Sequence, residues 1–243
     1  MGTPNRIAAL ARILMTPGGI RAAAYWRPFS LTAFAMARTL RAQGLQPDLI
    51  VDGGANVGQF ARAMAETFPD ARVVSFEPLP DVAASFRSHF ASTSRVRLVE
   101  AALGAEAGTL AFHRNPYSLA SSALPVAEDD DLVVPHSETV SVPVTTLDLA
   151  LHDEMITPST LLKLDLQGFE LEALRGASET LRQVGTVLLE IALRPSYSGE
   201  PSFEALLDHL RPFGFRFLRP IDILRDSATG EIVQMDALFA ATT

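Results

Sequence analysis

The chain has 243 residues, of which 48% are hydrophobic and 20% are charged, and its formal net charge is −8 at pH 7. This length is enough for one α/β domain with a sizeable core, and the acidic balance argues against nucleic acid as the main partner, because phosphate binding needs a basic surface. The chain has no cysteine, which excludes disulfides, thiolate metal sites and cysteine nucleophiles and fits a reducing cytoplasm.

The N-terminal segment, residues 1–47, has its own composition. It contains six arginines and no acidic residue, and apolar residues recur with helical spacing over 5–15 and 30–43, on either side of Pro17, Gly18, Gly19 and Pro28, which break the pattern. We therefore predict an N-terminal helical cap over residues 1–47, ahead of a single domain over residues 48–243. Its arginines are expected to be solvated, with contact to an anionic membrane or a carrier protein as the alternative. We expect no signal peptide and no membrane span, and hence a cytoplasmic protein.

Residues 49–58 read Leu-Ile-Val-Asp-Gly-Gly-Ala-Asn-Val-Gly and predict a strand at 49–52, a glycine turn and a helix at 58–68. The next strand, at 72–77, ends on Glu77. Glycines let a backbone approach a ligand, a helix N-terminus offers free N–H groups, and an acid at the end of the second strand accepts hydrogen bonds from ribose hydroxyls. The segment therefore predicts a nucleoside-binding unit.

The spacing of the glycine turn indicates which nucleoside is bound. A dinucleotide fingerprint requires glycine at its first, third and sixth positions, but this chain has Gly53, Ala55 and Gly58 there. Asp52 directly precedes the turn, and an acid at this position suits a cationic ligand with an amino-acid tail and repels a pyrophosphate. We therefore expect S-adenosylmethionine (SAM) as the cofactor rather than a nicotinamide dinucleotide.

Beyond the second strand, strands and helices continue to alternate, which implies a parallel sheet with helices on both faces. Two short antiparallel strands interrupt the series, and we interpret the long loop between them, residues 114–138, as a lid that closes over the site together with the N-terminal segment. In chain order we predict a helix at 80–91, a strand at 96–102, the inserted strands at 109–113 and 140–145, a strand at 160–165, a helix at 169–177, a strand at 186–191, a helix at 202–211, and a closing hairpin of strands at 214–219 and 232–240.

A second group of polar residues follows the strand at 160–165. Because ligands of open α/β sheets bind outside the carboxyl ends of strands, Asp165 and Glu77 are expected to face one crevice. Lys163, the chain's only lysine, points to the same face of the sheet as Asp165, and Glu190 ends a later strand at the same crevice. We predict Asp165, Glu190 and Lys163 as catalytic residues.

Structural roles remain open for these residues, because Asp165 also suits a helix cap and Lys163 also suits an ion pair with a carboxylate. Oxygen ligands of this kind also attract Mg²⁺, but the spacing of His and acidic residues shows no compact metal motif, so we predict no metal site.

Several segments resemble the FkbM family of SAM-dependent methyltransferases. They are Asp-Gly-Gly-Ala-Asn-Val-Gly at 52–58, Ser-Phe-Glu-Pro at 75–78, Ala-Ala-Leu-Gly at 101–104, Lys-Leu-Asp-Leu-Gln-Gly-Phe-Glu at 163–170, and Leu-Glu-Ile at 189–191 followed by Tyr-Ser-Gly at 197–199. The resemblance covers residues 48 to 240 in the right order. It implies a class I (Rossmann-like) methyltransferase fold, with a seven-stranded, mostly parallel sheet and a C-terminal antiparallel hairpin.

The resemblance also implies roles for individual residues. On the donor side it implies that SAM contacts Asp52, Gly54, Asn56, Gly58, Glu77, Glu100, Ala101 and Asp165. Within this set Glu77 is expected to hold the ribose hydroxyls, and Glu100 stands where the family has Asn. On the acceptor side we predict contacts from Ser121, Ser122, Gln167, Arg194 and Tyr197.

The function that follows is SAM-dependent O-methyl transfer to a hydroxyl of a sugar, glycolipid or secondary metabolite. Its partner is then a small-molecule acceptor and no nucleic acid. Two alternatives stay open because a fold does not fix a function. One is a nicotinamide-dependent oxidoreductase, and the other is a SAM-binding partner protein without catalysis.

Overall fold

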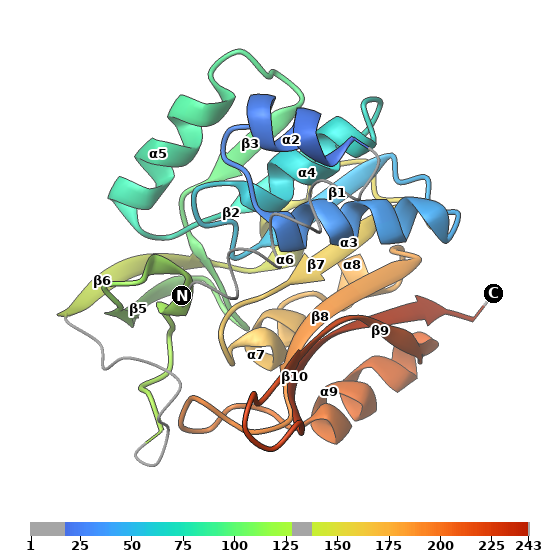
Figure 1. The fold of residues 1–243 in the computed structure, drawn as a ribbon. Coiled ribbons are helices and arrows are strands. Elements are labelled where there is room, and N and C mark those ends of the chain that lie inside the picture. The colour runs from blue at the N-terminus through green and yellow to red at the C-terminus, as the bar shows by residue number, and fades with distance from the viewer. Residues whose placement is uncertain (1–17, 128–137, 243) are drawn as a thin grey trace.

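The computed structural model of the chain describes residues 18–127 and 138–242 (Figure 1). Its centre is a seven-stranded sheet of order β3-β2-β1-β7-β8-β10-β9. The first five strands of this order run parallel, while β10 is antiparallel to both β8 and β9, and this layout confirms the predicted fold class. The strands are β1 (Leu49–Gly53), β2 (Arg72–Phe76), β3 (Val96–Val99), β7 (Leu161–Leu164), β8 (Thr186–Ala192), β9 (Phe215–Arg225) and β10 (Ile232–Ala241).

Helices cover both faces of this sheet, which explains why its central strands are apolar on both sides. Ile50 of β1 and Leu161 of β7 share one core with α3, α4 and α5, and Val51 and Leu162 share the other core with α6, α7, α8 and α9. The helices are α2 (Gly19–Tyr25), α3 (Leu31–Ala42), α4 (Gln59–Thr67), α5 (Pro80–Phe90), α6 (Leu147–Ala150), α7 (Glu170–Arg175), α8 (Ser178–Leu181) and α9 (Phe203–Leu210), with short 3₁₀ turns at η1 (Ser118–Ala120) and η2 (Arg211–Phe213).

The described part of the N-terminal segment belongs to the core. Ser30 caps α3 by accepting a backbone hydrogen bond, and Leu40 lies fully buried in the same core as β1 and β7. The break that we predicted before α3 was wrong in part, because α2 occupies residues 19–25 of it. Gly18, with φ of 80°, starts that helix rather than ending one. The predicted helix over 5–15 lies outside the described residues.

The predicted strand at 96–102 was wrong in its second half. β3 ends at Val99, and Ala102–Leu103 form a separate strand, β4, in a second sheet of order β4-β6-β5 with β5 (Gly108–Arg114) and β6 (Glu138–Thr145). Both pieces carry apolar side chains, so the apolar run does not mark the point where the chain leaves one sheet for the other. The antiparallel pairing of the two inserted strands, β5 and β6, is confirmed.

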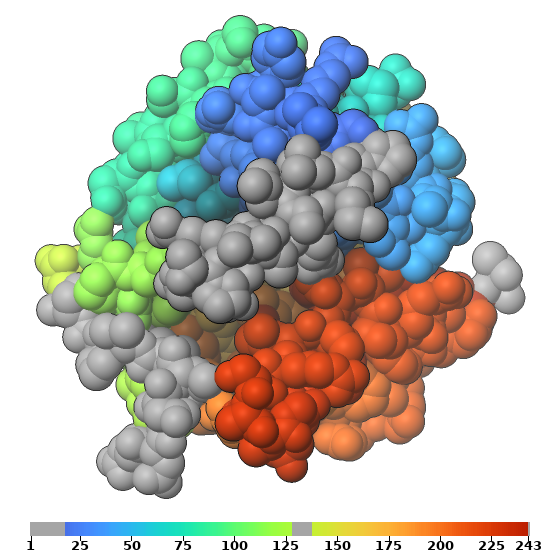
Figure 2. Space-filling model, in the orientation of Figure 1, coloured from blue at the N-terminus to red at the C-terminus, as the bar shows by residue number. Residues whose placement is uncertain are grey.

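The carboxyl ends of β1, β2, β7 and β8 meet at one edge of the large sheet, where ligands of such sheets bind. Figure 2 shows the outer surface of the N-terminal helices in blue at the top and that of the β9–β10 hairpin in red below.

Over the described ranges, none of the helices combines the length and the apolar character that crossing a membrane requires.

Candidate active site

Two cavities lie at this edge of the sheet. The glycine-turn cavity is lined by residues of the turns after β1, β2 and β7, among them Gly54, Glu77 and Asp165. The hairpin cavity is lined by β8, β9, β10 and the loops beside them. Gln167 and Leu119 line both cavities, so the two spaces adjoin at these residues.

The glycine turn brings the end of β1 against the end of β7. Gly54 has φ of 77°, and a Cβ atom on it would lie 1.9 Å from the backbone oxygen of Asp165. Glycine is required here for two reasons. A positive φ destabilises residues that have a Cβ atom, and the Asp165 backbone leaves no space for such an atom. Asn56 also has a positive φ, 49°, and its side chain donates to Ser118 Oγ at 2.9 Å.

Glu77 lies at the end of β2 and is 6% exposed. Its Oε2 accepts the N–H of Asn56 at 3.0 Å, and its Oε1 accepts the N–H of Leu79 at 2.9 Å. Burial raises the pKa of the Glu77 carboxyl to about 7, although both hydrogen bonds favour the ionised form. Each oxygen keeps a lone pair for a ligand hydroxyl in the cavity.

Lys163 lies beneath the two cavities and lines neither of them. Its Nζ is 3.3 Å from the Gly53 carbonyl oxygen, 3.3 Å from Asp52 Oδ1 and 3.4 Å from Asp165 Oδ2. Burial opposes the charge on the amine, but the carboxylates of Asp165 and Asp52 outweigh it and raise the pKa of Lys163 above its usual range. Asp52 is fully buried, and burial raises its pKa against the opposing effect of Lys163. This arrangement is a buried charge cluster under the glycine turn.

Gln167 joins the predicted acidic residues. Its Nε2 donates to Asp165 Oδ1 at 2.7 Å and to Glu190 Oε1 at 2.6 Å, and its Oε1 lies 3.0 Å from the Tyr197 hydroxyl. The structure therefore brings together four predicted site residues at the boundary of the two cavities. The backbone of Gln167 has φ of 54°, which is uncommon for a residue with a side chain.

The hairpin cavity carries a row of three acids, of which the sequence predicted only Glu190. Asp236 of β10 is the cross-strand neighbour of Glu190 on β8 and of Asp222 on β9, and all three line the cavity. Burial and the negative charge of Asp165 raise the pKa of Asp236 to about 7. Sequence reasoning missed Asp222 because we predicted its strand to end at 219. Sequence reasoning could have found Asp236, because it is an acidic residue between apolar residues of a predicted strand.

The loop after β5 closes against both cavities. Ser121 lines the glycine-turn cavity and accepts the N–H of Asn115 at 3.0 Å, while the buried Ser122 donates to the carbonyl oxygen of Gln167 at 2.7 Å. The described part of this loop thus covers the site through its own hydrogen bonds. Residues 128–137 of the predicted lid lie outside the described residues.

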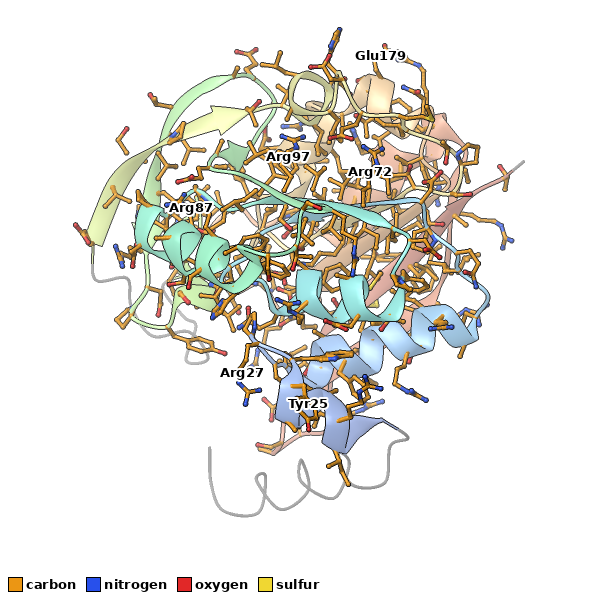
Figure 3. All side chains as sticks on the ribbon, turned by 90° about the horizontal axis from the view of Figure 1, so that it is seen from above. Tyr25, Arg27, Arg72, Arg87, Arg97 and Glu179 are labelled. Carbon is orange, nitrogen blue, oxygen red and sulfur yellow. The ribbon has the colours of Figure 1, made fainter. Side chains whose placement is uncertain are left out.

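Three predicted residues have other surroundings. Glu100 is exposed and pairs with the exposed Arg87, which Figure 3 labels beside α5, although its neighbour Ala101 lines the glycine-turn cavity. Gly58, with φ of 96°, packs against aromatic rings, since a Cβ atom there would lie 2.5 Å from the ring of Phe90. Arg194 lines the hairpin cavity and pairs with Asp226 at 3.1 Å.

Within the part of the chain that the structure describes, no group of three or more His, Asp or Glu side chains is arranged to hold a metal ion. The side chains at the boundary of the cavities include the carboxylates of Asp165 and Glu190, the amide of Gln167 and the phenol of Tyr197.

Comparison with known proteins gives one family. The model of the methyltransferase FkbM domain matches residues 52–217. The chain is 28% identical over 178 residues to the 2-O-methyltransferase NoeI of Sinorhizobium fredii, covering 69% of this chain and 73% of that protein. It is 29% identical over 205 residues to the methyltransferase sdnD of Sordaria araneosa, covering 74% and 75%. Among solved structures, magnesium protoporphyrin IX methyltransferase (ChlM) from Synechocystis PCC 6803, with bound SAM, has a TM-score of 0.47 and 12% identity, covering 87% of this chain and 78% of that chain.

Proposed function

This chain belongs to the FkbM family of methyltransferases, with SAM as the methyl donor, and on this premise we propose that it is an O-methyltransferase acting on a hydroxyl of a sugar, glycolipid or secondary metabolite. Membership of a methyltransferase family removes the nicotinamide oxidoreductase alternative. A 2-O-methyltransferase among the relatives supports oxygen as the atom that is methylated.

The observation that carries the proposal is the contact between the two cavities at Gln167. We assign SAM to the glycine-turn cavity, which Gly54 lines and where Glu77 offers oxygen lone pairs to ribose hydroxyls. We assign the acceptor to the hairpin cavity, whose polar lining and Tyr197 suit a hydroxylated molecule. Asp165 lies where the donor space meets the acceptor space.

SAM supplies an electrophilic methyl group on a positively charged sulfur. The tasks of the chain are to align the acceptor oxygen with this methyl, to exclude water and to take up the hydroxyl proton. Asp165, held by Lys163 and Gln167, lines the donor cavity at its boundary with the acceptor cavity, and it serves either as the base or as a group that orients the acceptor.

Cofactor binding tests the donor half of this proposal. Isothermal titration should show that the wild type binds SAM and not NAD. Glu77→Ala should weaken SAM binding at least tenfold, about 1.4 kcal/mol, because two ribose hydroxyls lose their acceptor. Glu106→Ala, which changes an exposed glutamate in a nearby loop, is the matched control and should bind SAM as the wild type does. NAD binding without SAM binding would contradict the assignment.

Methyl transfer tests the acceptor half. Wild-type protein, SAM carrying a labelled methyl group, and a panel of sugars, glycolipids and polyols should give a product whose label mass spectrometry places on oxygen. Label on nitrogen would refute O-methylation. Tight SAM binding with no product, either from the panel or from extracts of the host cell, would favour the partner protein without catalysis.

A further inference from the structure

Two carboxylates lie at the boundary of the cavities, and the proton of an acceptor hydroxyl can pass to either of them. Both accept hydrogen bonds from the same amide nitrogen, so distance to Gln167 does not distinguish Asp165 from Glu190. Their other neighbours do. When two acids of one site have environments that separate their proton affinities, the acid with the higher affinity in its ionised form is the better base near neutral pH.

Asp165 has a cationic partner. Its Oδ2 lies 3.4 Å from Nζ of Lys163, which is 5% exposed and therefore holds its charge out of contact with water. A buried cation next to a carboxylate stabilises the ionised form, because the charge is weakly screened. Asp165 is thus held in place by a cation at one of its carboxylate oxygens. It suits the orientation of a hydroxyl and attraction of the positively charged donor.

Glu190 has the opposite surroundings. Among the described residues no cation forms an ion pair with Glu190: Lys163 interacts with its charge but pairs with Asp52 and Asp165. The neighbours of Glu190 in space include Asp165, Asp236 and Glu170. Burial, followed by the negative charges of these three acids, raises the pKa of Glu190 well above its ordinary value. Glu190 also lines the hairpin cavity, where the acceptor is assigned, whereas Asp165 lines the glycine-turn cavity.

We propose, on the basis of the proposed function, that Glu190 is the general base of the methyl transfer, and that Asp165 and Gln167 are the residues that position it and the acceptor. As the acceptor oxygen forms its bond to the methyl carbon, the methyl–sulfur bond breaks with its electron pair left on sulfur, and the O–H proton moves to a Glu190 oxygen. The positive charge of sulfur and the negative charge of Glu190 disappear together. No further reactant is needed.

Gln167 sets the spacing of the two acids. Its amide can face them in one way, because nitrogen must point to the two carboxylates while oxygen accepts from the Tyr197 hydroxyl at 3.0 Å. The amide therefore supplies one N–H to each carboxylate. Asp165 and Glu190 also contact each other through a side-chain hydrogen bond, which favours a protonated Glu190. The N–H donors of Gln167 oppose this effect, because a hydrogen bond to a carboxylate favours its ionised form.

The charged and titratable groups around Glu190 come from every element packed on it. They are Asp165 and Lys163 from the end of β7, Glu170 from α7, Asp236 from β10, Asp222 from β9, and Arg194, Tyr197 and Glu200 from the loop after β8. Arg194 is paired with Asp226, so acids dominate the surroundings. The acid limb of the pH profile is therefore expected above the ordinary range of a glutamate.

The test compares Glu190→Gln with Asp165→Asn at saturating SAM over a range of pH. Glu190→Gln should lower kcat about 10²- to 10⁴-fold and abolish the acid limb, because the base is lost, while SAM affinity stays close to that of the wild type. Asp165→Asn should keep an acid limb and move it to lower pH, because a negative charge next to Glu190 is removed. The reverse pattern, in which Asp165→Asn abolishes the limb and Glu190→Gln only moves it, would overturn the proposal.

Gln167→Met tests the positioning role. It removes both N–H donors at similar volume, so the acid limb should move up by about one pH unit, the equivalent of a tenfold change in proton affinity. Gln234→Met makes the same chemical change elsewhere in the hairpin cavity and should leave the limb in place, whatever it does to the KM of the acceptor. Equal profiles for the two variants would refute the role of Gln167.

A titration without turnover completes the test and separates it from the proposed function. With ¹³C-labelled carboxyl groups, NMR of the SAM-free wild type should show Glu190 titrating above the ordinary range of a glutamate, with its signal assigned from Glu190→Gln. Titration of Glu190 within that ordinary range would overturn the base assignment even if methyl transfer to oxygen is observed. A wild type that transfers no methyl to oxygen would overturn the proposed function and the base assignment with it.

Discussion

At the scale of single residues, Glu77 links cofactor binding to pH. Burial raises its pKa to about 7, and hydrogen bonds from ribose hydroxyls would favour its ionised form, so SAM binding should lower this pKa and release a proton. SAM affinity should therefore rise as the pH increases from about 6 to 8. Isothermal titration in buffers of different ionisation enthalpy measures both effects. Glu77→Gln should bind SAM more weakly and with a flat pH profile, and equal wild-type affinity at both pH values would contradict the role.

The sequence predicted those site residues that follow from the direction of a strand. Glu77 and Asp165 end parallel strands, and parallel strands place their carboxyl ends at one edge. Glu100 shows the limit of this reasoning, because it follows β3 but pairs with Arg87. The place of Arg87 depends on how α5 packs, which the direction of β3 does not predict. Asp236 was not predicted because its distance to Glu190 depends on the register between two strands that are 46 positions apart in the chain.

At the scale of elements, glycine is needed in the glycine turn because of a steric clash at position 54 as well as a positive φ. Gly54 and Gly230 have nearly equal angles, 77° and 78°, but a Cβ on Gly54 meets the Asp165 backbone at 1.9 Å, whereas that on Gly230 meets nothing within 4 Å. Gly230→Ala should cost about 1–2 kcal/mol for the positive φ and leave SAM binding unchanged. Gly54→Ala should cost more and abolish SAM binding. Urea unfolding and isothermal titration measure the two effects, and similar losses in both variants would show that strain alone matters.

Elements with strong periodicity, such as α4, α5 and β8, lie within one or two residues of their predictions. The errors fall where two forces compete. Gly18 and its neighbours predict a break, yet α2 forms there because its Ala22 is buried, and tertiary packing overrides a weak local preference. The change of sheet after Val99 leaves no trace in the apolar pattern, since both sheets accept apolar residues.

At the scale of the whole molecule, buried acids couple folding to pH. Burial raises the pKa of Glu170 to about 8 and those of Glu77 and Asp236 to about 7, from 4.5 for glutamate and 3.8 for aspartate. Between these values the folded state holds protons that the unfolded state has released, so stability is greatest below the unfolded pKa and falls as pH rises through the folded pKa. The free energy of unfolding of the ligand-free protein should therefore be lower at about pH 8.5 than at about pH 6.

Urea unfolding at the two pH values measures this difference. Glu170→Gln should reduce it, because one of the titrating groups is removed, while Glu106→Gln changes an exposed residue and should not. A difference that is unchanged in Glu170→Gln would assign the pH dependence to other groups.

We predicted a boundary at residue 47 from the composition of the sequence. In the structure, residues from both sides of this position pack into one hydrophobic core. Leu40 of α3 is fully buried with Ile50, Leu161 and Leu188, three residues of the central strands. Helical periodicity predicts that α3 has an apolar face, but it does not identify the surface that this face covers. Over its described part, we therefore propose that the N-terminal segment is a layer of the methyltransferase fold.

Lys163 carries the chain's only ε-amino group, and it is 5% exposed beneath the glycine turn. Acylating reagents that label proteins through surface lysines would find no such target on this surface. Beyond the α-amino group at the chain terminus, the extent of acylation would report how often the buried cluster opens to solvent. Acylation of Lys163 would therefore measure the opening of the buried charge cluster under the proposed site. While the cluster stays closed, no acylation of this residue is expected.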